Sequence, residues 1–338
     1  MEALIVIHFL LELFQFERNI DLERQTNNVT TEYVSRMPAI VNIDKMVPKR
    51  INRFETNAQG FVINDRTHRF VAVAARHHEA GDEAEMAMGY EFTDRNGVTS
   101  PRQIIRLGFF EAIHQFFENH LRGSSVYIAE FIVGSTWQNL FPQGTKIIIG
   151  HLKCPERSHN ALEALTPFIE SVKKITVRVH SPNDPVFENE IIGKVEKLVI
   201  DYSGRGVDSW TDLLRNLPVP HVHMAEKINL LDLIPLINMW ISDKKKIGTK
   251  FTMQATTVPQ FIFSIVTWLK AQKKVIDGRS SGQFPFVLTL PIDDQSELII
   301  NGSETPAEFR TLAGSGWPTP QMLVIEVMPK GTADEIDA

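Results

Sequence analysis

The sequence holds one serine motif with the spacing of a catalytic nucleophile, GRSSG at residues 278–282. In hydrolases the Gly-x-Ser-x-Gly pattern forms a sharp turn between a strand and a helix, which exposes the serine above a sheet. Here the pattern follows a predicted helix over 261–274 and precedes a predicted strand, so the order of elements is inverted. We interpret residues 278–282 as a Gly/Ser loop, and a hydrolase acting through Ser280 is the alternative.

Two histidines, His221 and His223, have the spacing that could begin a metal site. Side chains alternate along a strand, so both imidazoles would lie on one face of a predicted strand over 219–225, with Asp201 or Asp232 as a further ligand. A tetrahedral site needs three or four placed ligands, and this pattern supplies two. The sequence therefore predicts the half-exposed edge of a strand, and no metal, cofactor or catalytic residue is expected.

The most apolar segment of the chain is LIVIHFLLELF at residues 4–14. It has no positively charged start, it is interrupted by His8 and Glu12, and it is too short to span a bilayer, so we expect a helix rather than a signal peptide or a membrane anchor. One stripe of that helix is the candidate partner-binding surface, and burial of the helix in the protein's own core is the alternative. The stripe consists of Leu4, Ile7, Leu11 and Phe14.

The composition of the chain indicates which class of partner to expect and in which cellular compartment the protein functions. The 338 residues carry 41 acidic and 35 basic side chains, a net charge of −6. Nucleic-acid binders gain affinity from lysine and arginine displacing counterions, so no nucleic-acid partner is expected. The single cysteine, Cys154, excludes an intramolecular disulfide and favours a reducing compartment, so we expect an intracellular protein of the cytoplasm or nucleus.

Residues 1–145 are predicted to form an N-terminal α+β module. Its pattern indicates a β-hairpin over 61–73 with its turn at Asn64-Asp65, a polar loop over 77–89, a helix over 108–121 and a strand over 125–133. Gly123 is the expected helix stop.

From residue 146 strand and helix patterns alternate. The predicted strands begin near residues 146, 174, 196, 219 and 249, at spacings of 28, 22, 23 and 30 residues. Units of about 20 to 30 residues are typical of leucine-rich repeats. We predict an α/β fold of irregular leucine-rich-like strand–helix repeats, with parallel strands in sequence order and the helices on one face; an ordinary alternating α/β sheet is the alternative. The first of the helices is expected over 159–171.

Three tryptophans fall on successive predicted helices, at Trp210, Trp240 and Trp268. We expect them to pack in a shared helix layer, and a tryptophan-lined groove is the alternative. Strand patterns at 284–290, 297–301 and 321–327 would cap the open end of the repeats. The predicted organisation is an N-terminal module at 1–145, repeats at 146–280, a strand cap at 281–330 and a disordered tail at 331–338.

Four runs of residues carry a resemblance to a known family. They are VSRMPAIVNIDKMVPKRINRFETNAQGFVIND at 34–65, YEFTDRN followed by SPRQII from residue 90, HLRGSSVYIAEFIV from residue 120, and LFPQGTKIIIGHLKC from residue 140. In order and spacing they resemble the nematode F-box C protein-related family, a domain of unknown function followed by leucine-rich-like repeats, over most of residues 10–275. F-box proteins bind the Skp adaptor of a cullin ubiquitin ligase through an N-terminal helical module, and their C-terminal repeats recruit a substrate. No Leu-Pro step opens this chain, so its N-terminal helices would be a degenerate form of that module.

We therefore expect a non-catalytic protein–protein interaction module, a substrate-recognition component related to F-box ligase adaptors. Its implied partners are a Skp-type adaptor and a substrate protein, without nucleic acid or membrane. Two alternatives belong to other classes. One is the hydrolase that uses Ser280, and the other is a stand-alone structural or interaction protein with no ligase role.

Overall fold

The computed structural model describes most of the chain from residue 50 to residue 332 and divides it into two compact units. Unit 1 is Met1–Glu156 with Glu163–Ser171, and unit 2 is Arg157–Leu162 with Val172–Ala338. The described residues are 50–64, 66–73, 87–99, 103–105, 109–134, 141–204, 209–225, 230–255, 263–265, 267–268, 277–281, 284–304 and 321–332. The N-terminal stripe of Leu4, Ile7, Leu11 and Phe14 and the tail after residue 332 lie outside them, and the predicted boundaries at 145, 280 and 330 stay predictions.

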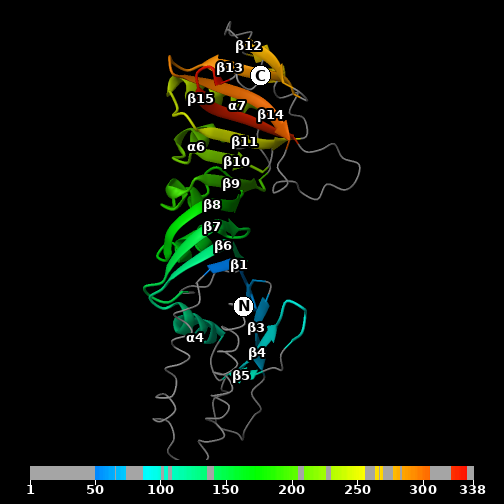
Figure 1. Cartoon of the computed structure of the whole chain (residues 1–338), viewed down its shortest axis with the longest axis vertical. Coiled ribbons are helices and arrows are strands. Elements are labelled where there is room, and N and C mark those ends of the chain that lie inside the picture. Colours follow the sequence, from blue (N-terminus) through cyan, green and yellow to red (C-terminus); the bar gives the residue numbers. More distant parts are fainter. Residues whose placement is uncertain are drawn as a thin grey trace, which may run out of the picture. The chain divides into compact units, whose positions relative to one another are not determined.

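Unit 1 contains a mixed sheet and one long helix (Figure 1). The sheet order is β7-β6-β1-β2-β3-β4-β5, in which β1 and β7 pair parallel with β6 and the remaining neighbours pair antiparallel. The elements are β1 (Arg50–Asn57), β2 (Gly60–Ile63), β3 (Arg66–Val73), β4 (Ala87–Thr93), β5 (Gln103–Ile105), α4 (Phe109–Leu121), β6 (Ser125–Val133) and β7 (Lys146–Cys154).

An aromatic core holds α4 on this sheet. The ring of Phe54 on β1 lies 4.8 Å from Phe131 on β6 and 5.8 Å from Phe117 on α4, and all three side chains are buried. Tilted and edge-on ring pairs at such distances add about 0.5–1.5 kcal/mol each beyond the burial of their area. The apolar face of the amphipathic helix α4 therefore packs on the sheet, and this contact fixes the position of the helix.

Three sequence predictions in the described part of Met1–Glu156 are confirmed, and one is corrected. The hairpin is present as β2 and β3 with Asn64 in the left-handed region at a φ of 49°, and the helix and strand over 108–133 are present as α4 and β6. The predicted polar loop over 77–89 is wrong at its end, because Ala87–Gly89 already pair with β3 as the start of β4. Pairing with a neighbouring strand overrides the weak local preference of small residues.

Unit 2 is built on parallel strands that follow the order of the sequence. Strands β8, β9 and β10 each pair parallel with the next strand in sequence, and from β11 the sheet continues antiparallel through β15, β14, β13 and β12 (Figure 1). The elements are β8 (Ile169–Val179), the 3-10 helices η1 (Pro185–Glu188) and η2 (Ile192–Lys194), β9 (Lys197–Tyr202), α6 (Thr211–Asn216), β10 (His221–Met224), α7 (Leu230–Ser242), β11 (Lys250–Ala255), β12 (Asp277–Ser281), β13 (Phe284–Pro291), β14 (Ser296–Glu304) and β15 (Gln321–Pro329). The predicted α/β class and the predicted parallel direction of these strands are confirmed.

The first helix after β7 is shorter than predicted. Helix α5 (Ser158–Leu165) ends in a turn, and Ile169 already begins β8, so the predicted helix over 159–171 is wrong over 166–171. Pro167 is the cause, because proline lacks an N–H and disfavours helical geometry at the residue before it. Among the described residues no helix is long and apolar enough to cross a membrane.

Two of the three tryptophans lie in the core of unit 2. Trp210 is 1% exposed and Trp240 is 3% exposed, so the packing prediction is confirmed for both and a groove lined by them is wrong. Trp210 caps α6 rather than lying inside it, and its ring meets Tyr202 edge-on at 5.0 Å. The apolar area that these two rings bury holds the helix layer on the sheet.

Candidate functional site

The serine motif lies inside a strand. Residues Asp277–Ser281 form β12, which pairs antiparallel with β13 and shifts register between Arg279 and Ser281. The predicted Gly/Ser loop is therefore wrong, because β13 supplies a pairing partner that local composition does not reveal. A nucleophile elbow requires a helix directly after the strand, whereas the next described element is β13. The surroundings of Ser280 do not favour the hydrolase alternative.

The histidine pair lies in the middle of the unit 2 sheet. His223 is fully buried and His221 is partly exposed, and both lie on β10 between β9 and β11. The predicted strand edge is therefore wrong, because both sides of β10 are paired. The imidazoles share one partner on β11: His223 Nδ1 lies 2.8 Å and His221 Nε2 lies 3.2 Å from the Thr252 hydroxyl. The Thr252 hydroxyl therefore supplies a hydrogen-bond partner to Nδ1 of the buried His223.

The two aspartates considered as further ligands have other partners. Asp201 accepts a hydrogen bond from Arg178 Nε at 2.8 Å. Asp232 is buried at the start of α7 and accepts from the Ser209 hydroxyl at 2.7 Å and from the Trp210 backbone N–H at 3.2 Å. Its carboxylate therefore caps the start of α6 and joins the two helices. Within the described ranges no group of three or more His, Cys, Asp or Glu side chains is placed to hold a metal ion.

The single cysteine is buried, and its thiol is unreactive. Burial raises the pKa of the Cys154 thiol to about 12. Since the thiolate is the nucleophilic form, this side chain acts as a small apolar group in the core of unit 1.

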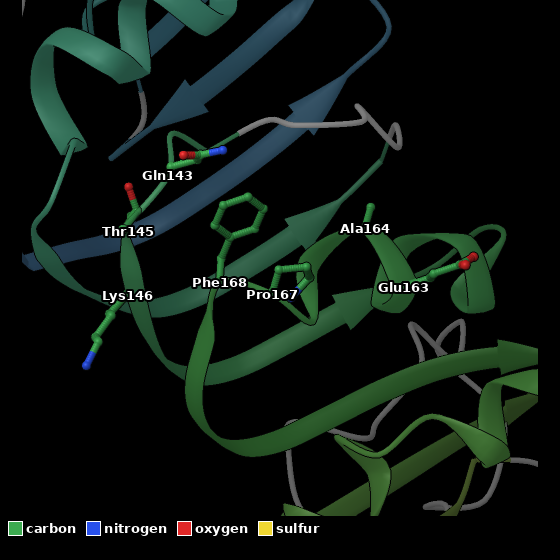
Figure 2. Close-up of a pocket in the computed structure, with 8 residues that line it drawn as sticks. Gln143, Thr145, Lys146, Glu163, Ala164, Pro167 and Phe168 are labelled. Atoms are coloured by element: carbon green, nitrogen blue, oxygen red, sulfur yellow. The ribbon is translucent and has the colours of Figure 1, made fainter.

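A pocket of about 620 Å³ opens on unit 1 where two turns meet (Figure 2). One turn precedes β7 and is closed by the Thr145 N–H donating to Pro142 O at 3.2 Å. The other follows α5 and is closed by the Phe168 N–H donating to Leu165 O at 2.9 Å. The Ile147 N–H donates to Phe168 O at 2.8 Å and ties the second turn to β7. The lining residues are Gln143, Gly144, Thr145, Lys146, Glu163, Ala164, Pro167 and Phe168.

The pocket combines an apolar wall with opposite charges. Phe168 and Pro167 lie next to each other in Figure 2, with Ala164 farther along on α5, and the Phe168 ring packs edge-on against the buried Phe141 at 5.8 Å. Lys146 and Glu163 point outward at opposite sides. Apolar surface next to a few polar and charged side chains is the usual composition of a binding pocket.

Sequence reasoning missed this pocket. Gly144 and Pro167 mark two turns, and glycine suits the left-handed φ of 77° at Gly144. What the pattern does not show is that these turns meet, because their contact depends on the bond between Ile147 and Phe168, which are distant in sequence.

Comparison with known families gives one match. A family profile described as a domain of unknown function (DUF3557) matches residues 110–257, a stretch from α4 to just beyond β11. No curated protein matches the sequence. The matched stretch contains both the pocket and the histidine cluster. The finer resemblance, to nematode F-box C protein-related sequences, stays a prediction.

Proposed function

We propose that this chain is a non-catalytic protein-interaction module that has strand–helix repeats of leucine-rich-like type and, in unit 1, a docking pocket. The pocket is the observation that supports it most directly. Its apolar wall is continuous with the aromatic core through Phe141, so the floor is rigid, and its charged groups stand at the rim. This division of apolar centre and polar rim is typical of protein-binding surfaces.

The arrangement of unit 2 supports the repeat part of the proposal. Strands β8 to β11 begin at Ile169, Lys197, His221 and Lys250, so each begins 24 to 29 residues after its predecessor. All four pair parallel in sequence order, and the Asp232 network joins α6 to α7. Short parallel strands that each return through a helical segment are the building plan of solenoid repeats.

The occupant we propose is a partner segment with one large apolar side chain next to a charged residue. The apolar side chain would contact Phe168 and Pro167, and the charged residue would pair with Lys146 or Glu163. Such an anchor in a desolvated pocket provides most of the affinity of small interfaces.

A paired crosslinking experiment tests the pocket. A photoreactive amino acid at Pro167 should capture a partner that the same group at Asn160, an exposed position on α5, does not capture. The captured segment, made as a peptide, should then bind the purified chain. Ala164→Glu should weaken that binding by about tenfold or more because it buries a carboxylate against the anchor, whereas Asn160→Glu should not. Equal capture at both positions, or unchanged affinity of Ala164→Glu, would contradict the proposal.

The ligase role that the family resemblance implies remains a proposal about the N-terminus. In it, a Skp-type adaptor binds the apolar stripe of Leu4, Ile7, Leu11 and Phe14. Deleting residues 1–16 should then abolish adaptor binding while the thermal midpoint is held. Loss of cooperative unfolding in the deletion variant would instead assign the helix to the protein's own core.

A further inference from the structure

Two polar side chains at the unit 1 pocket are available to a ligand. Lys146 and Gln143 are exposed lining residues, and within the part of the chain that the structure describes neither side chain makes a hydrogen bond or an ion pair. The other two polar side chains of the lining are engaged. Thr145 Oγ1 donates to Leu121 O at 3.0 Å, and Glu163 takes part in an interaction within the protein.

The apolar centre of the pocket is accessible beside them. Pro167 is exposed, and Phe168 and Ala164 are half-buried. The Ile147 N–H donates to Phe168 O at 2.8 Å, which places the preceding residue, Lys146, at the edge of this apolar surface. Figure 2 shows the Lys146 side chain pointing outward at the rim. A cation therefore stands directly beside the surface on which an apolar side chain of a partner would pack.

We infer that the pocket recognises an acidic partner segment, in which a carboxylate pairs with Lys146 and a neighbouring large apolar side chain packs on Phe168 and Pro167. This inference rests on the proposed docking function and narrows its ligand. A carboxylate beside Lys146 gains a charge-assisted hydrogen bond, whereas a basic residue there meets a like charge. A basic residue at the other side of the pocket would compete with the interaction that Glu163 already makes.

The arrangement of the pocket also defines the spacing of the motif. Side chains two residues apart in an extended segment lie on the same side, roughly 6–7 Å from one another, which is close to the separation of neighbouring strands of about 4.8 Å. The acidic residue is therefore expected within two positions of the apolar anchor. The Gln143 amide has two donors and one acceptor oxygen, which suit the backbone of such a segment whatever its sequence.

Selection of a random peptide library on the full chain tests the inference. Peptides that bind the parent chain but not Ala164→Gln, which fills the pocket without adding charge, should share a large apolar residue with Asp or Glu within two positions. Lys146→Glu should weaken the binding of such a peptide by about tenfold or more, and replacing the acidic residue of the peptide by lysine should restore it. Lys246→Glu, at an exposed position in unit 2, is the matched control and should bind like the parent chain.

The outcomes separate this inference from the docking function on which it rests. If no peptide is selected that Ala164→Gln loses, both are contradicted. Selected peptides that lack an acidic residue near the anchor, or that bind Lys146→Glu as tightly as the parent chain, would overturn the acidic ligand and leave the docking function standing. An equal loss in Lys146→Glu and Lys246→Glu would assign the effect to the net charge of the chain, which also overturns the acidic ligand.

Discussion

Each unit of the molecule has a row of charged side chains across parallel strands, and the two rows are built on opposite principles. In unit 1 the register places Glu130 of β6 between Arg53 of β1 and His151 of β7. Glu130 pairs with Lys153 at 2.5 Å and with Arg53 Nε at 3.9 Å. In unit 2 the register places four basic residues side by side on neighbouring strands, and we call them the basic row: Lys174 on β8, Lys197 on β9, His221 on β10 and Lys250 on β11. Alternating charges stabilise the strands that carry them, whereas charges of one sign do not.

The ionisation of Glu130 shows how the unit 1 row works. Burial alone would raise the pKa of its carboxyl. The Lys153 hydrogen bond and the positive charges of Lys153, Arg53 and His151 outweigh burial, so the pKa of Glu130 lies below its usual value. The carboxylate is thus held ionised by its neighbours. The comparison teaches that the unit 1 register brings opposite charges together, whereas the unit 2 register brings basic side chains together.

The largest expected effect is a loss of stability from a change in the buried core of unit 2, outside the basic row. Trp240→Ala should lower the free energy of unfolding by about 3–5 kcal/mol, because the ring is 3% exposed and its removal leaves a cavity. Denaturant titration measures this loss. Trp268→Ala is the matched control at a partly exposed ring and should cost less. A cost below about 1 kcal/mol for Trp240→Ala would mean that the helix layer does not hold this sheet.

Local patterns in the sequence predict most of the elements that carry these rows. Strand patterns predict β6 and the strands β8 to β11 of unit 2, and apolar residues three and four apart predict α4. A turn-forming asparagine predicts the hairpin, because Asn64 tolerates a positive φ. These features depend on residues close together in the chain, so a local pattern is sufficient.

Features that depend on register between distant residues are not predictable in this way. The burial of His223, the pocket and the basic row all follow from which strand lies beside which. The GRSSG strand is missed for the same reason, since only the partner β13 makes it a strand. Lys174 and Lys197 are unremarkable until pairing places them side by side.

The next prediction concerns the buried polar cluster beside the basic row. Thr252→Val keeps the shape of the side chain but removes the hydroxyl that serves both His221 and His223. We expect a loss of about 1–3 kcal/mol, because His223 is fully buried and cannot turn to water. Thr289→Val, at a partly exposed position on β13, is the control. Equal costs at the two threonines would show that the cluster is not the reason for the loss.

Removing the carboxylate from the unit 1 row should have a smaller, pH-dependent effect. Glu130→Gln is expected to cost no more than about 1 kcal/mol at neutral pH, because the pair is partly exposed. The folded pKa is depressed, so the stabilisation is present above the ordinary value of 4.5 and is lost as the pH falls through the lower folded value. The stability curves of parent and variant should therefore converge in acid. A gap that stays constant below pH 4.5 would assign the cost to packing.

The smallest expected effect is a gain in stability rather than a loss. It tests the comparison of the two charged rows directly. Lys197→Gln removes the second cation of the basic row and relieves its repulsion of Lys174. We expect the free energy of unfolding to rise by a few tenths of a kcal/mol, roughly the size of a cross-strand charge pair. The gain should shrink with added salt, because the Debye length falls to about 10 Å at 0.1 M. Lys194→Gln, which breaks an exposed pair with Glu190 at 2.8 Å, should give no gain. If Lys197→Gln instead destabilised the chain as Glu130→Gln does, both rows would stabilise the fold and the contrast between them would be lost.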